Sequence, residues 1–140
     1  MKKLIGIGLT LVLLATILTV LPSGGNTSVI AVAPTDTPPP SEVWVDVSWA
    51  GHNPGDIVGG HTFGTDAFAK IQDGVNNVSG SIVHVAAGIY YENIYLIDGV
   101  ELLGAGSAST VIDGLQADTV IEIRNVGNTT RVDGFTVTNG

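Results

Sequence analysis

Residues 81–104 read SIVHVAAGIYYENIYLIDGVELLG, a series of short apolar strands separated by turn residues. Apolar and polar side chains alternate in these strands, which is the pattern of β-strands with one buried face. The chain holds four such strands, at 82–86, 100–103, 119–123 and 135–138. Val83, Leu102 and Ile121 lie 19 residues apart, and the next step, to Val137, is shorter. The apolar pattern therefore recurs with a period near 20 residues.

Asp-Gly pairs separate the strands and indicate turns, because aspartate favours turns and glycine adopts positive φ. These pairs occur at 98–99, 113–114 and 133–134. Repetition at this period, with two or three short strands in each repeat, is typical of a parallel β-solenoid whose coils pair with one another. We therefore predict an all-β fold built as a parallel solenoid.

The composition agrees with a turn-rich β protein of one domain. Of 140 residues, 19 are glycine and 13% are charged, whereas a helical bundle needs charged solvent faces. The absence of cysteine excludes a disulfide framework, a thiolate zinc site, an iron–sulfur cluster and a cysteine nucleophile. The net charge of −8 argues against nucleic acid as a partner.

The N-terminus carries a predicted signal peptide, residues 1–31. Two lysines precede an apolar run at 4–21, and small residues offer a cleavage site after Ala31. Because the run is also long enough to span a bilayer, an uncleaved membrane anchor is the alternative. A Pro-rich linker follows at 32–41. In either case we expect a secreted or extracytoplasmic protein.

The predicted fold contains one amphipathic helix. The segments are an N-terminal strand and Gly-rich loop at 42–66, a capping helix at 67–78 and the first coils of the solenoid at 79–140. Ile71, Val75 and Val78 fall on one face of the helix. Asp66 is the expected N-cap of this helix. Gly74 lies in the middle of the predicted range and weakens the helix prediction, so that the helix could stop there. We expect the helix to cover the open core end of the first coil.

Four segments carry a family resemblance. They are FAKIQDGV at 68–75, VHVAAGIYYENI at 83–94, LGAGSASTVIDG at 103–114 and VDGFTVTNG at 132–140. Together they resemble the N-terminal cap and first coils of the pectin-lyase-like superfamily, and pectinesterases open in a similar way. The resemblance covers roughly 44–140 and implies a right-handed parallel β-helix with an N-terminal capping α-helix, preceded by a signal peptide. Lyases, hydrolases, esterases, epimerases and surface proteins share these motifs, so the resemblance implies the fold more than an activity.

The catalytic residues of that family lie on later, central coils. In pectinesterases they are two Asp, an Arg and Gln, and in lyases they are calcium-binding acidic residues with a basic residue. No position of this sequence matches them, so we assign no catalytic, cofactor-binding or metal-binding residue, and calcium stays an unsupported alternative. The chain stops directly after a strand, so we expect an N-terminal fragment or a truncated product that self-associates through its open C-terminal coil.

The histidines are the first candidates for chemistry. Histidine and carboxylate are good metal ligands, and five such residues share the N-terminal strand and loop: Asp46, His52, Asp56, His61 and Asp66. Their spacing matches no defined motif, so a role in loop structure is favoured. His84 alternates with two valines and is predicted to be a solvated, outward strand residue rather than a catalyst.

A polar corner follows the second strand of the repeat. Glu92 and Asn93, with Tyr90 and Tyr91, could contact sugar, because aromatic faces stack on sugar rings. The resemblance favours a structural turn, since in pectinesterases this segment is not the active site.

Further carboxylates recur along the coils. Asp98, Asp113 and Asp133 each precede glycine and are predicted turn formers, without the spaced ligand set of a calcium loop. Glu101 and Glu122 could stack on the outer face and bind a cation or act as acid and base. A solvated face is the simpler interpretation, and we favour it.

The sequence therefore predicts an exported β-helix repeat protein that serves as a scaffold for polysaccharide or cell-surface recognition, with no complete active site. The alternative is the N-terminal fragment of a polysaccharide lyase or pectinesterase. A third interpretation is a non-functional truncated product.

Overall fold

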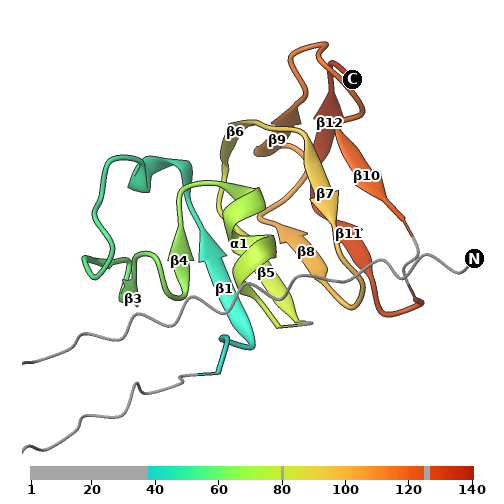
Figure 1. Cartoon of the computed structure of the whole chain (residues 1–140). Helices are drawn as coiled ribbons and strands as arrows, with labels where there is room; N and C mark the ends of the chain where they lie inside the picture. Colours follow the sequence, from blue (N-terminus) through green and yellow to red (C-terminus); the bar gives the residue numbers. More distant parts are fainter. Residues whose placement is uncertain (1–37, 80, 125–126) are drawn as a thin grey trace, which may run out of the picture. The chain divides into compact units, whose positions relative to one another are not determined.

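The computed structural model describes residues 38–79, 81–124 and 127–140. The predicted signal peptide, 1–31, and residues 32–37 of the predicted linker lie outside this range. The described part is largely β, with one short α-helix (Figure 1). Its helices are η1 (a 3-10 turn, Val47–Trp49) and α1 (Ile71–Asn77). Its strands are β1 (Glu42–Val45), β2 (Ile57–Val58), β3 (His61–Thr62), β4 (Ala67–Phe68), β5 (Ile82–Val85), β6 (Gly88–Tyr91), β7 (Ile94–Leu96), β8 (Glu101–Gly104), β9 (Thr110–Asp113), β10 (Ile121–Ile123), β11 (Arg131–Asp133) and β12 (Thr136–Thr138).

Parallel pairing dominates the described part of the chain. Three sheets are parallel throughout, with strand orders β11-β8-β5-β1-β4, β12-β9-β6 and β10-β7, and β2 and β3 form an antiparallel hairpin. From β5 onward, consecutive strands belong to the three parallel sheets in a fixed order. Strands β5, β6 and β7 lie one in each sheet, β8, β9 and β10 repeat this order, and β11 and β12 add to the first two sheets. The prediction of a mainly β fold with parallel pairing is confirmed, and this arrangement is compatible with a β-helix.

Apolar side chains line up in register across the five-stranded sheet. Val43 pairs with Val83, Val83 with Leu102, and Leu102 with Val132. The first three are fully buried, and Val132 packs partly buried against the same core. Because burial of such a side chain contributes about 1.5–3 kcal/mol, rows of this kind stabilise the stacked strands substantially.

The 19-residue spacing of the sequence holds for one step only. Ile121 pairs with Ile94 in the two-stranded sheet, and the residue in line with Leu102 is Val132. The period near 20 residues that the spacing indicated therefore does not extend to Ile121, which lies on another sheet than Val83 and Leu102. The second circuit is longer because it contains the connections 105–109 and 114–120.

The capping helix is shorter than the predicted range 67–78. It spans Ile71–Asn77, while Ala67–Phe68 form strand β4, which pairs with β1. Asp66 is not the N-cap, because its carboxylate accepts a hydrogen bond from the Thr62 amide at 2.7 Å. The Asp66 side chain therefore organises the loop before β4 and not the helix.

The helix N-terminus is capped by a residue distant in sequence. Lys70 precedes the helix in an extended conformation and forms no side-chain cap. Instead the Ile71 and Gln72 amides donate to the two oxygens of the Glu92 carboxylate, at 2.8 and 3.0 Å. A negative charge at this position also suits the helix dipole. Glu92 therefore links the helix to the corner between β6 and β7.

The predicted apolar face of the helix is confirmed. Ile71, Val75 and Val78 are buried and belong to the hydrophobic core, although Val78 comes just after the last helical residue. Gly74 does not end the helix: a Cβ at this position would come within 2.9 Å of the Val45 side chain. The missing side chain thus lets α1 pack closely over β1 and β5 (Figure 1).

A second helical side chain occupies a sheet edge. The Gln72 amide accepts a hydrogen bond from Tyr95 N at 2.7 Å and donates one to Tyr95 O at 3.2 Å. Tyr95 lies in β7, at the edge of the two-stranded sheet that faces away from β10. Gln72 therefore takes the place that a neighbouring strand would have.

Candidate functional site

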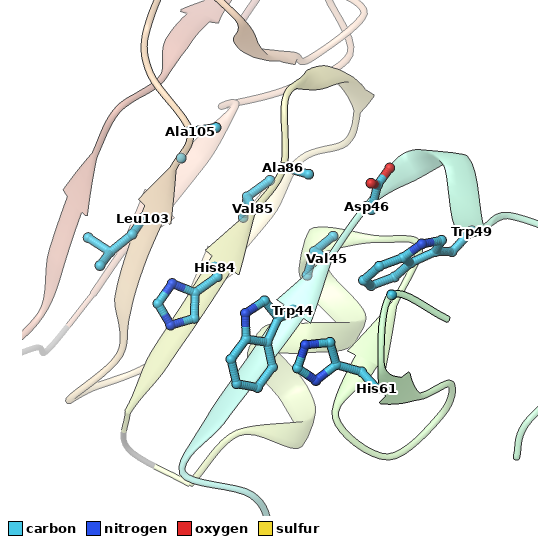
Figure 2. Close-up of a pocket in the computed structure, with 12 residues that line it drawn as sticks. Trp44, Val45, Asp46, Trp49, His61, His84, Val85, Ala86, Leu103 and Ala105 are labelled. Atoms are coloured by element: carbon cyan, nitrogen blue, oxygen red, sulfur yellow. The ribbon is translucent and has the colours of Figure 1, made fainter. Parts of the chain in front are cut away.

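The outer face of the five-stranded sheet carries a groove of about 380 Å³. Strand alternation turns Trp44, His84 and Leu103 to this face, where they are paired in register on β1, β5 and β8. The chain between β1 and β4 forms the other wall and contributes Trp49 and His61 (Figure 2). Both tryptophans of the sequence therefore line one groove.

Trp44 lies between two imidazoles. Its ring centroid is 3.9 Å from that of His61 and 5.2 Å from that of His84, and both pairs are stacked with an interplanar angle of 19°. The three rings form a row across the groove (Figure 2). His84 is partly exposed, as predicted, but its stacking on Trp44 was not predicted. The row joins β3 to β1 and β5.

Each of these imidazoles also meets a carboxylate. His61 Nδ1 lies 3.1 Å from Asp66 Oδ2, and His84 Nε2 lies 2.9 Å from Glu42 Oε2. Because an ionised carboxylate only accepts hydrogen bonds, these two ring nitrogens carry the protons. The second nitrogen of each neutral ring is then a hydrogen-bond acceptor.

Asp66 fixes the loop that carries His61. Burial works to raise the pKa of Asp66, but hydrogen bonds from the Thr62 amide and from His61 outweigh it, and the pKa lies below its ordinary value. Asp66 therefore remains ionised at neutral pH and holds the imidazole by a charge-assisted hydrogen bond.

Trp49 is positioned by a local turn. The Asp46 carboxylate accepts a hydrogen bond from Ser48 N at 2.8 Å and caps η1, the short helix that ends at Trp49. Gly59 lies against the indole: a Cβ there would come within 2.9 Å of Trp49 Cζ2, and its φ is +55°. Glycine at position 59 therefore permits both the backbone conformation and the close approach of the ring.

The structure does not assemble the metal site considered from the sequence. His52 pairs with Asp56 at 3.4 Å, His61 pairs with Asp66, and Asp46 caps η1. Within residues 38–79, 81–124 and 127–140, no group of three or more His, Asp or Glu side chains is placed to hold a metal ion. These residues organise the loop, which is the interpretation that the sequence favoured.

The polar corner at Glu92 has structural contacts. Glu92 caps α1, and Asn93 donates to the carbonyl groups of Asp118 and Thr119, at 3.2 and 3.1 Å. The buried Tyr90 hydroxyl donates to Ala86 O at 3.0 Å. These contacts engage Glu92, Asn93 and Tyr90 within the fold, which agrees with the structural turn that the resemblance favoured over sugar contact.

Two of the three Asp-Gly aspartates accept hydrogen bonds from backbone amides. Asp98 Oδ1 accepts one from Gly127 N at 2.6 Å, and Asp113 Oδ1 accepts one from Leu115 N at 2.9 Å. Asp133 pairs with Arg131 instead. The contacts of Asp113 with Leu115 and of Asp133 with Arg131 are local, whereas Asp98 binds an amide 29 positions along the chain.

The alternative in which Glu101 and Glu122 stack is wrong. Glu101 lies on β8 and is in register with Ile82 and Arg131, whereas Glu122 lies on β10 and is in register with Tyr95. The two carboxylates are therefore on different sheets.

Trp44 and Trp49 were not predicted as site residues. Trp44 and His84 both occupy outward positions of alternating strands, and this shared face is the signal that the sequence offered. No such signal marks Trp49, because it lies in a loop whose path depends on Asp46 and Gly59.

Comparison of the chain with protein-family models, with curated proteins and with solved structures gives no match. In the part of the chain that the structure describes, no helix is long and apolar enough to cross a membrane.

Proposed function

We propose that this chain is an exported repeat protein of pectin-lyase-like, right-handed β-helix architecture that binds a polysaccharide or cell-surface glycan in the groove over Trp44 and Trp49. The repeat pattern and the rotation of the chain through three parallel sheets support the architecture. The predicted signal peptide supports export.

The observation that carries the binding proposal is the convergence of both tryptophans on one groove. Val85, Ala86, Leu103 and Ala105 give this groove an apolar floor, and imidazole and indole nitrogens supply polar groups. A sugar ring presents C–H faces to aromatic surfaces and hydroxyl groups to such polar groups. The groove therefore offers the two kinds of contact that a glycan requires.

The charge distribution favours a neutral glycan. Three basic and 13 acidic residues follow residue 31. Asp46 lines the groove, and Glu42 and Asp66 are hydrogen-bonded to its histidines. Anionic polymers would be repelled by this surface unless cations bridged them.

Titration of the protein with neutral and anionic oligosaccharides, followed by tryptophan fluorescence and calorimetry, tests the proposal. We expect binding of a neutral oligosaccharide, and the Trp49→Ala variant should weaken it at least about tenfold. Tyr91→Ala removes an exposed aromatic residue of another sheet and should leave the affinity unchanged. Failure of every oligosaccharide to bind, or equal losses in both variants, would overturn the proposal.

The alternative function is that of a polysaccharide lyase or carbohydrate esterase whose reactive residues are not in this chain. Purified protein is therefore expected not to cleave or de-esterify polygalacturonate, with or without calcium. Turnover well above a blank would favour the enzymatic alternative over the scaffold.

A further inference from the structure

The wall of the groove that contains Trp49 and His61 belongs to a long connection, residues 46–66, between β1 and β4. Its antiparallel element is the short β2–β3 hairpin. His61, on β3, reaches from this connection to the sheet and stacks on Trp44 at 3.9 Å. His61 is therefore one of the contacts that hold this connection to the rest of the fold, beside the Val47 amide, which donates to the Tyr90 hydroxyl at 3.4 Å.

We propose that His61 is a proton-dependent latch that holds residues 46–66 against the sheet more firmly when its imidazole is protonated. The inference goes beyond the proposed function, because it concerns how the groove is held and not what binds in it.

A carboxylate and an indole face lie against His61. Its own connection contributes Asp66 at 3.1 Å, and β1 contributes the face of Trp44. Asp46, in the same connection, also lines the groove, with its carboxylate bonded to Ser48 N. On the other side of Trp44, β5 contributes His84, which is paired with Glu42.

The remaining charges lie further along the sheet and in the same connection. Strand β8 contributes Glu101, which faces Arg131 of β11 at 3.8 Å. His52 lies in the same connection but pairs with Asp56. No lysine or arginine lines the groove in the described part of the chain.

Protonation converts two existing contacts of His61 into stronger ones. The hydrogen bond to Asp66 becomes an ion pair, and the stacked ring becomes a cation over the indole face. A cation–π contact at an exposed site corresponds to roughly a two- to fivefold change in an equilibrium constant. Histidine side chains in general change charge between about pH 5 and 8, and this range sets the two pH values of the test.

Hydrogen exchange of the backbone amides in residues 47–66, corrected for intrinsic rates, tests the latch at about pH 8 and about pH 5.5. In the unmodified protein, opening of this segment should be roughly two- to fivefold rarer at the lower pH. The amides of β9, which carries no histidine and belongs to another sheet, serve as an internal reference. His61→Phe keeps a flat ring on Trp44 but cannot be protonated, so its segment should be equally protected at both pH values.

Two further variants test whether His61 and its carboxylate partner carry the pH difference. His52→Gln removes the other histidine of the connection and should keep the full difference, whereas Asp66→Asn should reduce it. Equal protection of the unmodified protein at both pH values, persistence of the difference in His61→Phe, or its loss in His52→Gln would overturn the proposal. Since no ligand is used, failure of glycan binding would not affect this result.

Discussion

Glu92 Oε1 accepts a hydrogen bond from Ile71 N at 2.8 Å, across 21 positions of sequence. The contact places a side chain from the β6–β7 corner at the N-terminus of α1. A helix of seven residues is marginal by itself, so it depends on contacts with the rest of the fold. The Glu92 carboxylate supplies such a contact and satisfies two amides that the helix leaves free.

Substitution Glu92→Gln should destabilise the protein by about 1–2 kcal/mol. The glutamine amide carries no charge and has a single acceptor oxygen for the two backbone amides of Ile71 and Gln72. Urea unfolding measures the change. Glu122→Gln alters a partly exposed carboxylate that pairs with Arg124 and should stay within about 0.5 kcal/mol of the unmodified protein. Equal losses in the two variants would contradict the assigned capping role.

Gly74→Ala should also destabilise the protein, although alanine is the better helix former. The added methyl group would meet the side chains of Val45, Val43 and Val83 at 2.9, 3.3 and 3.3 Å, and overpacking of this kind costs about 1–3 kcal/mol. Thermal unfolding compares this variant with Asn76→Ala, an exposed position on the same helix, for which little change is expected. Stabilisation by Gly74→Ala would show that α1 packs less closely on the sheet.

The third prediction concerns alkaline pH. Burial raises the pKa of Tyr90 to about 12, whereas a tyrosine in the unfolded chain ionises near pH 10. The unfolded state therefore loses its proton first, and the free energy of unfolding should fall as the pH rises from about 10 to about 12.

Tyr90→Phe should lack this alkaline loss, at a cost of about 1 kcal/mol at neutral pH for the lost hydroxyl contacts. Urea unfolding at about pH 8 and about pH 11 measures both effects. Tyr91→Phe, at an exposed position, should keep the alkaline loss of the unmodified protein. The same alkaline loss in Tyr90→Phe would mean that another group is responsible.

The fourth prediction concerns self-association of the 140-residue chain. Val137 is in register with the fully buried Ile112, yet it is 48% exposed, and within the described residues no strand pairs with the far edges of β11 and β12. We expect this surface to associate, and Val137→Lys to reduce association in sedimentation experiments.

Ile89→Lys is the matched control, because Ile89 has a similar exposure of 49% and lies on β6, at the opposite edge of the same sheet. It should leave association unchanged. A monomeric chain at tens of micromolar (roughly the range in which exposed edges aggregate) would contradict the prediction.

Local patterns were sufficient to predict several strands, the parallel pairing and the buried face of the helix. Val83 and Leu102 are neighbours in register as their spacing indicated, and Ile71 and Val75 are buried. Such features depend on the alternation or helical period of nearby residues, which a sequence displays directly.

Features set by distant residues could not be predicted. The helix starts four positions later than expected because Asp66 bonds to Thr62 and the cap comes from Glu92. Likewise, the stack of His61 on Trp44 requires the path of a long loop, which no short-range pattern determines.

The Gln72 amide makes the two edges of the two-stranded sheet different. Because it holds both the N–H and the C=O of Tyr95, strand β7 has no free backbone groups at that residue for another chain to use. The opposite edge of the sheet, on β10, is built from the same backbone groups without such a side-chain substitute among the described residues. A β-strand arriving from another molecule would therefore find a template on only one side, and any growth of this sheet would be unidirectional.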